Sequence, residues 1–593
     1  MDGESELVDS ALARLFVGSG RTAEAATFLL PGGRTLFSAG DPADTLYYVK
    51  TGRLGVLRQE DGREQQFVGV IRSGEPVGEM ALIAGTPHTA TVIAMRDSEI
   101  MALPSAVLLA DAHRRPRVMA ELARLVIQRI RDTGPRGAAS DPTVFGFVGV
   151  DPTIPVRPLL EKVEAELAKL GFSAAVVGSE ALPAPIAWFT QTELQHEFVL
   201  YCAEAGERDW VEVCGRQVDR LVLIGDGDAE PPKDTSPFAG EAIRQHRLID
   251  LVLLHGRATK RPKGTAGWLD AVGAGRALHL RKDYEADTAR LARLISGTAI
   301  ALVLSGGGSR AYAHMGAIRA LREAGHPIDL VGGCSMGAII GAGVALEWTN
   351  EEIEERIEEA FVSSSPIADI AFPMIAMTRG SKVKARLKEH FGSTDIADLW
   401  LPFFCVSSNL TTGVHQVHRR GELAWALQAS SAVPGVLPPI VDGDDVLVDG
   451  AVLRNFPADV MRGGHRGPIV GVDVSRSRGI TAEDIAGPPS MWRWIFSGEW
   501  LRGPPIVSLL MRSATVSSIR DLLAAREATD LLIQPQVEHI EIRDWKAFGP
   551  AVEAGYVATV AALGALKGPL THLRRRNAEA AQRAALSAVQ NPS

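Results

Sequence analysis

The most constraining feature of this 593-residue chain is the stretch 302–343, in which two glycine-rich turns each follow an apolar run. The first turn is the glycine triplet 306–308, directly after the strand-like run 301–304. The second is Gly333-Cys334-Ser335-Met336-Gly337, a G-x-S-x-G sequence that precedes a helix of small residues. A G-x-S-x-G between a strand and a helix places its serine on a sharp turn, with the hydroxyl exposed above a sheet. The stretch therefore predicts an α/β layer that carries a nucleophilic serine, Ser335.

The glycine triplet predicts a second part of the same site. Glycines tolerate unusual backbone angles and let the chain approach other groups closely. Their N–H groups can therefore point at a single spot. Preorganised donors of this kind stabilise the negative charge that develops on an oxygen in a transition state.

An aspartate with a buried pattern follows far downstream, in Asp445-Val446-Leu447-Val448-Asp449-Gly450-Ala451. The apolar run predicts a short strand that ends at Asp449, and the glycine lets the chain turn away. This places the carboxylate at the C-terminal edge of the strand, where ligand chemistry collects in open α/β sheets. Ser335 and Asp449 together supply a nucleophile and a base.

These three motifs, in this order, resemble the patatin-like phospholipases, which carry G-G-G-x-R/K-G, G-x-S-x-G and D-G-A/G. The run 429–439, A-S-S-A-V-P-G-V-L-P-P, is similar to the A-S-S-x-x-P-G-x-F-P-P run of that family. Within the family the chain looks like the neuropathy target esterase branch, which joins cyclic-nucleotide-binding-like domains to a patatin domain. The resemblance implies a serine esterase that hydrolyses a lipid ester, a lysophospholipid or a phospholipid, through an acyl-enzyme.

The resemblance also implies roles within the site. Ser335 is the nucleophile and Asp449 the base of a dyad, which requires a direct hydrogen bond of about 2.6–3.2 Å. The oxyanion loop comprises Gly306, Gly307, Gly308, Ser309 and Arg310. The amides of Gly307, Gly308 and Ser309 are the expected donors, and Arg310 orients the loop or meets a phosphate head group. Ala311 replaces a glycine of the family, and would strain the loop if that position needs a positive φ.

Two other functions stay open on the sequence alone. An α/β-hydrolase with a Ser–Asp–His triad needs a histidine after the acid. The candidates are His465, His539 and His572. His314 precedes the serine and is expected to be structural. The second alternative is a non-catalytic or weakly active scaffold with a cyclic-nucleotide-binding-like sensor, against which the intact Ser335 and Asp449 argue.

Residues 22–109 have short strands separated by turn signals, a pattern typical of a β jelly roll. The run Tyr47-Tyr48-Val49-Lys50-Thr51-Gly52-Arg53-Leu54 resembles a cyclic-nucleotide-binding domain. In that family a glutamate binds the ribose and an arginine binds the cyclic phosphate. The matching pocket residues are Gly78, Glu79, His88 and Thr89, with His88 in the place of the arginine.

Histidine is mostly uncharged at neutral pH, whereas arginine is a permanently charged bidentate donor. We therefore expect weak phosphate binding, and two interpretations stay open: a cyclic nucleotide regulates the protein, or the domain is a retained scaffold. Regulation by this domain, with or without a ligand, is a hypothesis that rests on domain order alone. DNA binding would need a helix-turn-helix, whereas residues 120–131 predict one basic helix that a Gly/Pro/Ser linker follows.

The chain divides into four predicted parts. A jelly roll with a C-terminal helix covers 1–135, and a Rossmann-like α/β domain covers 143–296. The patatin-like hydrolase domain covers 297–567, and a helical tail covers 568–593. In the second part, apolar strands at 144–150, 221–224 and 251–254 accompany a helix at 159–170. Without a G-x-G-x-x-G it is assigned no dinucleotide, and residues 278–281 and 289–293 are expected to dock it onto the hydrolase domain, with His279 as a packing residue.

Composition favours a cytoplasmic protein without a metal or other cofactor. The net charge of −9 argues against nucleic-acid binding. The four cysteines have no metal or disulfide spacing, which suits a reducing compartment. A signal peptide is not recognisable, and no apolar run approaches the ~20 residues of a membrane span. Any membrane contact is therefore expected to be peripheral.

One aromatic stretch, 491–501, suits membrane contact or a lid over an acyl chain. It contains Trp492, Trp494, Phe496 and Trp500. A buried capping helix explains the same pattern equally well.

Overall fold

The structure, a computed structural model, describes residues 26–58, 66–107, 123, 126, 142–232, 249–363, 369, 371, 375–475, 519–542, 544–574 and 577. The chain forms two compact units. The first extends to residue 226 and adds 230–253 and 269–276, and the second comprises 227–229, 254–268 and residues from 277 onward. This division does not test the four domain boundaries given above, which stay predictions.

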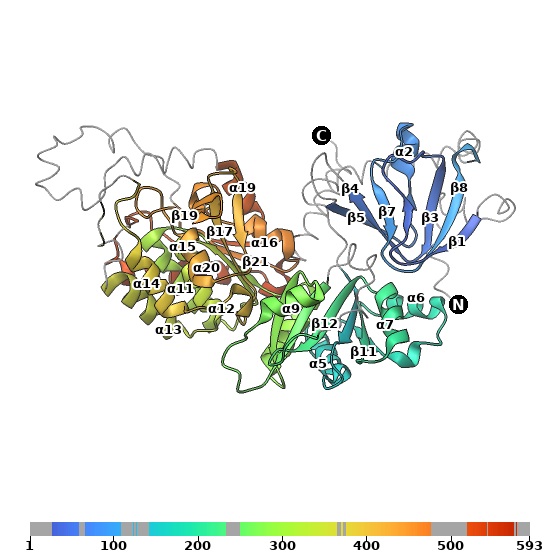
Figure 1. Ribbon diagram of the computed structural model, residues 1–593, viewed down its shortest axis with the longest axis horizontal. Helices are drawn as coiled ribbons and strands as arrows, with labels where there is room; N and C mark the ends of the chain where they lie inside the picture. Colours follow the sequence, from blue (N-terminus) through green and yellow to red (C-terminus); the bar gives the residue numbers. More distant parts are fainter. Residues whose placement is uncertain are drawn as a thin grey trace, which may run out of the picture. The chain divides into compact units, whose positions relative to one another are not determined.

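The first unit begins with a sandwich of two four-stranded antiparallel sheets (Figure 1). Their orders are β1-β8-β3-β6 and β2-β7-β4-β5. Both sheets contribute apolar side chains to one core, among them Phe37, Val49, Leu54 and Ile100. The predicted jelly roll is confirmed. Its elements are β1 (Ala26–Leu30), β2 (Thr35–Phe37), β3 (Thr45–Thr51), β4 (Arg53–Arg58), β5 (Gln66–Arg72), β6 (Pro76–Val77), α2 (Glu79–Ala84), β7 (Thr91–Ala94) and β8 (Ser98–Pro104).

A six-stranded sheet with the order β10-β11-β9-β12-β13-β14 follows. Strands β10, β11, β9 and β12 run parallel to one another. The residues of β9 and β11 are buried throughout, as is typical of parallel strands that helices cover. The three predicted strands are present, and the predicted helix begins three residues earlier than expected. The elements are β9 (Val144–Gly149), α5 (Val156–Lys169), β10 (Ala174–Val177), α6 (Ile186–Gln195), β11 (Phe198–Ala203), α7 (Arg208–Gln217), β12 (Arg220–Asp226), β13 (Ile249–His255), α9 (Thr265–Val272) and β14 (Arg276–Arg281).

The second unit is built on an eight-stranded sheet with the order β19-β20-β17-β16-β15-β21-β22, and β18 pairs with β17. The neighbours from β17 to β22 in this order are parallel. The pairs β17–β18, β17–β20 and β19–β20 are antiparallel. The strands are β15 (Ala301–Leu304), β16 (Leu330–Cys334), β17 (Phe403–Asn409), β18 (His415–His418), β19 (Ile440–Asp442), β20 (Asp445–Asp449), β21 (Ile469–Val472) and β22 (Leu531–Ile533).

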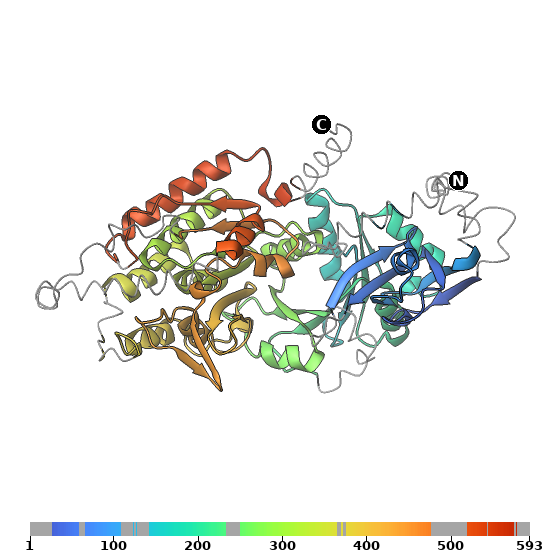
Figure 2. The same ribbon diagram turned by 90° about the horizontal axis from the view of Figure 1, so that it is seen from above.

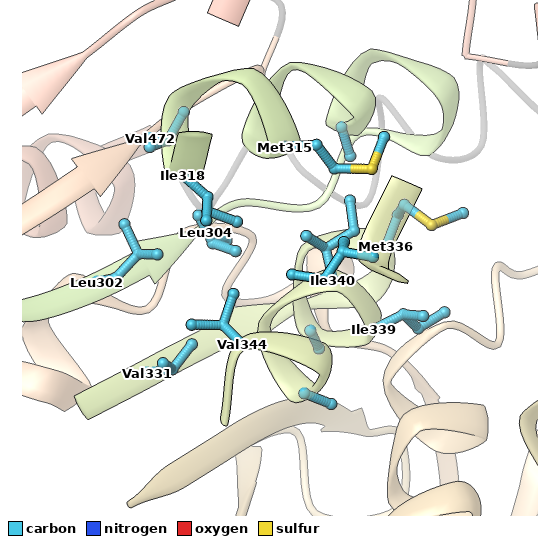
Figure 3. Close-up of a cluster of buried hydrophobic side chains, with 14 of the residues drawn as sticks. Leu302, Leu304, Met315, Ile318, Val331, Met336, Ile339, Ile340, Val344 and Val472 are labelled. Carbon is cyan, nitrogen blue, oxygen red and sulfur yellow. The ribbon is translucent and has the colours of Figure 1, made fainter. Parts of the chain in front are cut away.

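Alternate residues of β15 point to opposite faces of this sheet. Leu302 and Leu304 belong to one apolar cluster with residues of α11 (Ala313–Glu323) and α12 (Ser335–Ala345) (Figure 3). Ala301 and Val303 belong to a second cluster with residues of α16 (Ala458–Gly464) and α19 (Ile519–Glu527). Figure 2 shows the long helix α20 (Phe548–Gly564), which contacts α11 and lies on the first of these faces. The sheet is thus covered by helices on both sides.

The strand β14 and the helix α10 (Glu285–Ser296) contact other elements of the second unit. His279 Nε2 donates to the carbonyl oxygen of Ala397 over 2.8 Å. Burial lowers the pKa of His279 to about 3, so its imidazole is neutral. Arg293 of α10 forms an ion pair of 2.6 Å with Asp329, which precedes β16. The predicted packing role of His279 is confirmed. The docking of the middle domain onto the hydrolase domain stays a prediction.

The described residues lack both a membrane-spanning helix and a cluster of metal-ligating side chains. No helix in them is both long enough and apolar enough to cross a lipid bilayer. Nor do they contain a group of three or more histidine, cysteine, aspartate or glutamate side chains that could hold a metal ion.

Candidate active site

Ser335 lies at the turn where β16 ends and α12 begins. Its φ of 54° is in the left-handed region, which residues with a side chain rarely adopt. Such angles recur at active sites, where the surrounding structure holds them. Gly337 is required here, because a Cβ would collide with the carbonyl oxygens of Leu304 and Ser305. The strand–turn–helix that the sequence predicts around Ser335 is therefore present.

Asp449 is the last residue of β20, and its carboxylate meets the serine directly. Ser335 Oγ donates a hydrogen bond to Asp449 Oδ2 over 2.7 Å. This length falls within the range expected for a dyad without an intervening imidazole.

The path of β20 to this point differs from the expectation. β20 is antiparallel to β17, with Asp449 opposite Ser407. β16 is parallel to β17, with Cys334 opposite Val406. β20 therefore enters from beyond the carboxyl ends of the parallel strands, and its last residue arrives beside Ser335. The carboxylate reaches the predicted edge through a strand reversal that the sequence does not indicate.

The carboxylate of Asp449 is 1% exposed and accepts three hydrogen bonds. Oδ1 accepts from Ala451 N at 2.8 Å and from Cys334 Sγ at 3.7 Å, and Oδ2 accepts from Ser335 Oγ. Burial disfavours the charged form. It outweighs the three donors and raises the pKa of Asp449 to about 6. The group is therefore ionised at neutral pH, yet it is a stronger base than an exposed aspartate.

The glycine loop after β15 passes directly beside the nucleophile. A Cβ on Gly306 would lie 3.1 Å from Ser335 Cβ. Asn455 holds this part of the loop through two hydrogen bonds. The backbone carbonyl oxygen of Asn455 accepts from Gly306 N, and its side-chain Nδ2 donates to Gly306 O, both over 3.2 Å.

The amides of the loop differ in what they contact. Ser309 N donates to the carbonyl oxygen of Ile542 over 3.0 Å, so it is already engaged. Within the part of the chain that the structure describes, the amides of Gly307 and Gly308 have no acceptor. Gly308 has a φ of 57°, and a Cβ there would collide with the backbone of Ile542. Of the three expected donors, Gly307 and Gly308 are thus the two whose N–H groups have no partner among the described residues.

Arg310 is 5% exposed and contacts the backbone that supports the loop. Its Nε donates to the carbonyl oxygen of Ile540 over 2.6 Å. It also lines a cavity of about 140 Å³. The other lining residues are Asp473, Val474, Ser475, Gln534, Pro535, Gln536, Val537 and Glu538. Because neither member of the dyad lines this cavity, Arg310 borders a space separate from the Ser335–Asp449 contact.

Ala311 does not strain the loop. Among the described residues, the positive-φ positions other than glycine are Asp283, Ser335 and Glu347. Ala311 lies in the short 3₁₀ turn Gly308–Tyr312 and is fully buried. The replacement of glycine by alanine is therefore accommodated, because this position needs no left-handed backbone.

In the described part of the chain, none of the histidines considered for a triad forms a hydrogen bond with the Asp449 carboxylate. The partners of the Asp449 carboxylate are Ser335, Ala451 and Cys334, and none of them is His465, His539 or His572. His314 Nε2 donates to the carbonyl oxygen of Ser305 over 2.8 Å. Burial lowers the pKa of His314 to about 4, so this ring is neutral and structural, as expected.

Three family models match the chain. They are a patatin-like phospholipase over residues 302–462, a cyclic nucleotide-binding domain over 28–110 and a neuropathy target esterase (NTE) family P-loop like domain over 184–289. An uncharacterized NTE family protein of Mycobacterium tuberculosis is 30% identical over 553 residues, which are 90% of this chain and 91% of that relative. The chain belongs to the NTE family.

Other relatives of this NTE-family chain are longer. Patatin-like phospholipase domain-containing protein 6 from Mus musculus and from Homo sapiens are each 29% identical over 88% of the chain. The chain spans less than half of their length, 44% and 43%. Among solved structures, the N-terminal domain of a transcriptional regulator from Streptomyces coelicolor matches 21% of this chain and 94% of its own, at 32% identity and a TM-score of 0.17.

The N-terminal domain of this NTE-family protein offers no cation at the predicted cyclic-phosphate position. The His88 ring is 6% exposed and stacks on Phe37, with 3.7 Å between ring centroids. Burial lowers the pKa of His88, so the ring is neutral at physiological pH. Glu79 is buried, Thr89 is exposed, and residues 78–89 contain neither lysine nor arginine. These residues do not fit a cyclic phosphate.

A carboxylate occupies the N-terminus of α5, the first helix of the middle domain. Anions bind at helix N-termini because free N–H groups point outward there. At the start of α5, the amides of Val156 and Arg157 both donate to Glu204 Oε1 over 3.1 Å. The chain also contains no Gly-Lys dipeptide, which a P-loop requires. These residues do not fit a nucleotide phosphate at this helix.

Some predictions fall on residues outside the described part of the chain. They concern Trp492, Trp494, Phe496 and Trp500, and most of the segments 120–131 and 568–593. Conversely, the structure adds contacts that the sequence reasoning missed. Asn455 and the backbone of residues 540–542 hold the glycine loop, and no motif in the sequence signals these contacts. Ser430, whose hydroxyl accepts a hydrogen bond from Ser335 N over 3.0 Å, lies in the run 429–439 of the resemblance.

Proposed function

We propose that this protein is a serine esterase that hydrolyses a lipid ester, a lysophospholipid or a phospholipid. The observation that supports the proposal best is the 2.7 Å hydrogen bond from Ser335 Oγ to Asp449 Oδ2. Membership of the NTE family and the match to a patatin-like phospholipase model support the substrate class. Contact with a membrane surface would be peripheral, at the point where the protein takes up its substrate.

In the first half of the reaction, Ser335 Oγ attacks the ester carbonyl carbon while Asp449 Oδ2 accepts the hydroxyl proton. The carbonyl oxygen becomes an oxyanion, which the amides of Gly307 and Gly308 stabilise. The carbon–oxygen bond to the leaving alcohol then breaks, and Asp449 returns the proton to that alcohol. The acyl group stays on Ser335 as an ester.

In the second half, water attacks the acyl-enzyme and Asp449 takes a proton from it. The second tetrahedral intermediate again faces Gly307 and Gly308. Its collapse releases the fatty acid, and the proton returns to Ser335 Oγ. Each proton thus passes through one carboxylate, without an imidazole relay.

The proposal is tested by hydrolysis of two substrates with the full chain. A p-nitrophenyl ester of a short fatty acid reports the chemistry of the dyad alone, and lysophosphatidylcholine reports a lipid with a head group. Hydrolysis of both supports the proposal. If the p-nitrophenyl ester is cleaved and none of several lysophospholipids and phospholipids is, the dyad chemistry stands and the lipid substrate class is wrong.

The pH dependence of hydrolysis follows from the base. Asp449 acts only when ionised, and its pKa is raised to about 6. We expect kcat/KM to be constant above neutrality and to fall about tenfold for each pH unit below 6. Enzyme incubated at low pH and assayed at neutral pH controls for unfolding. A rate that stays constant down to about pH 4.5 would contradict a buried aspartate base.

Cyclic nucleotides are expected to leave the rate of hydrolysis unchanged. A ligand shifts an equilibrium only through different affinities for two states, and the residues around His88 do not fit a cyclic phosphate. The measurement is the rate with cyclic AMP or cyclic GMP added to the full chain, with His88→Arg as the variant that supplies a cation. A change in the rate of the wild type on addition of either nucleotide would contradict the scaffold interpretation.

A further inference from the structure

A second serine, Ser430, contacts the backbone of the nucleophile Ser335. It is the last residue of α15 (Leu423–Ser430). Ser335 N donates to Ser430 Oγ over 3.0 Å, and Ser430 Oγ donates to the carbonyl oxygen of Val406 over 2.7 Å. Ser430 is fully buried. The hydroxyl therefore links the first amide of α12 to the strand β17.

The direction of both hydrogen bonds is fixed by chemistry. The carbonyl oxygen of Val406 can only accept, so the hydroxyl proton of Ser430 must point to it. A lone pair of the same oxygen is then left for the amide of Ser335. That amide is one of the N-terminal N–H groups of a helix, which have no partner within the helix. Cys334, the residue at the N-cap position, provides no side-chain hydrogen bond to it.

Fixing this amide matters because φ is the rotation about the bond from N to Cα. With the N–H direction held by Ser430 and φ at 54°, the direction of the Cα–Cβ bond of Ser335 is set. The same amide is also removed from the set of groups that can stabilise an oxyanion. This leaves that task to the glycine loop.

The turn that follows Ser430 holds the base as well. Asp449 N donates to the carbonyl oxygen of Ala432 over 2.9 Å. Residues 430–432 thus contact the backbone of both members of the dyad, through the Ser430 hydroxyl on one side and the Ala432 carbonyl on the other. These two contacts come from within three consecutive residues, so the separation between nucleophile and base depends on this short segment.

We infer that Ser430 is a positioning residue of the dyad, and that the Ser430 hydroxyl and the Ala432 carbonyl set the register between Ser335 and Asp449. The inference rests on the proposed esterase function. Ser430 touches no reacting atom. It acts through the orientation of Ser335, so its loss lowers the reactivity of the nucleophile and leaves substrate binding unchanged.

The test compares Ser430→Ala with wild type in two assays on the full chain. The first is the second-order rate constant of covalent labelling by a fluorophosphonate, and the second is the kinetics of p-nitrophenyl ester hydrolysis. We expect both the labelling rate and kcat to fall by about 10- to 100-fold, because small misplacements of a reacting group are costly. KM is expected to change by less than about twofold, since the binding surface is untouched.

Ser431→Ala is the matched control. Ser431 is the adjacent residue and is also buried, but its hydroxyl donates to the carbonyl oxygen of Leu427 in α15 over 2.7 Å. We expect this variant to react like the wild type. Rates are normalised to the folded fraction from a thermal unfolding curve, so that a general loss of stability is not counted as a loss of reactivity.

Ser430→Cys covers the case in which the alanine variant does not fold. A thiol keeps nearly the same volume but accepts a hydrogen bond only weakly, so an intermediate labelling rate is expected. Full wild-type reactivity of the folded Ala or Cys variant would overturn the inference, as would an equal loss in Ser431→Ala. A wild type that is neither labelled nor active would instead overturn the proposed function on which the inference rests.

Discussion

Replacing Ser335 by alanine is expected to abolish ester hydrolysis, with a fall in kcat on the order of 10⁵-fold or more. The hydroxyl is the group that forms the acyl-enzyme, and no other side chain bonded to Asp449 can take its place. Cys334 Sγ also contacts the carboxylate, at 3.7 Å, but burial and the nearby negative charge raise the pKa of this thiol well above its ordinary value. A thiol that stays protonated is a poor nucleophile.

The measurement is the hydrolysis rate of a p-nitrophenyl ester by Ser335→Ala, with Ser431→Ala as the control. Alanine can keep the backbone of the turn between β16 and α12, so the variant is expected to fold. Its circular dichroism spectrum and unfolding temperature check this. Residual activity within about tenfold of the wild type would show that another group is the nucleophile.

Replacing Asp449 by asparagine is expected to lower kcat by about 10²- to 10⁴-fold, the range for loss of a general base. Asparagine has the same shape. Its carbonyl oxygen can still accept from Ala451 N, and its NH₂ group can donate to Ser335 Oγ. The amide cannot, however, take the serine proton. The side chain thus stays in place while the base is lost.

The same variant is expected to be more stable than the wild type at pH 8. The pKa of Asp449 is raised to about 6 in the folded protein from 3.8. Its contribution to stability is therefore present below about pH 4 and is lost as the pH rises through 6. The loss is at most about 3 kcal/mol of unfolding free energy, from 1.36 kcal/mol per pKa unit. Asparagine does not ionise, so its contribution does not change with pH.

The measurement is the difference in unfolding temperature between Asp449→Asn and the wild type, at pH 5 and at pH 8. We expect the unfolding temperature of the variant to rise relative to that of the wild type between pH 5 and pH 8. Asp445→Asn, at the other end of β20, is the matched control, and its activity is expected to be unchanged. A destabilised Asp449→Asn at pH 8 would show that the carboxylate is better solvated than its 1% exposure implies.

The motifs of the sequence predicted much of the fold and the main contact of the site. The G-x-S-x-G around Ser335 implies its own turn, because the backbone of such a motif is determined locally. The strand before Asp449 and the strands of the N-terminal sandwich could also be predicted, because each follows from a pattern of neighbouring residues. The direct contact between the two side chains was implied by the resemblance to the patatin-like phospholipases, which use a serine–aspartate dyad.

What the sequence did not predict depends on contacts between distant segments. β20 runs antiparallel to its neighbour, so Asp449 arrives by a route that no local pattern shows. The amide of Ser309 was expected to face an oxyanion, but the carbonyl of Ile542, more than 200 residues later, takes it. Ala311 raised a concern about strain that only the backbone angles could remove. His88 stacks on Phe37, and ring stacking of this kind leaves no mark on sequence spacing.

The most direct test of the account is to find which residue a fluorophosphonate modifies in the wild-type protein. The reagent forms a covalent bond with an activated serine, and mass spectrometry of the digested protein locates it. A Ser335–Asp449 dyad predicts one label per chain, on the peptide that contains Ser335, and none in Asp449→Asn under the same conditions. A label on another residue, or an unlabelled protein that still hydrolyses esters, would contradict a Ser335–Asp449 dyad.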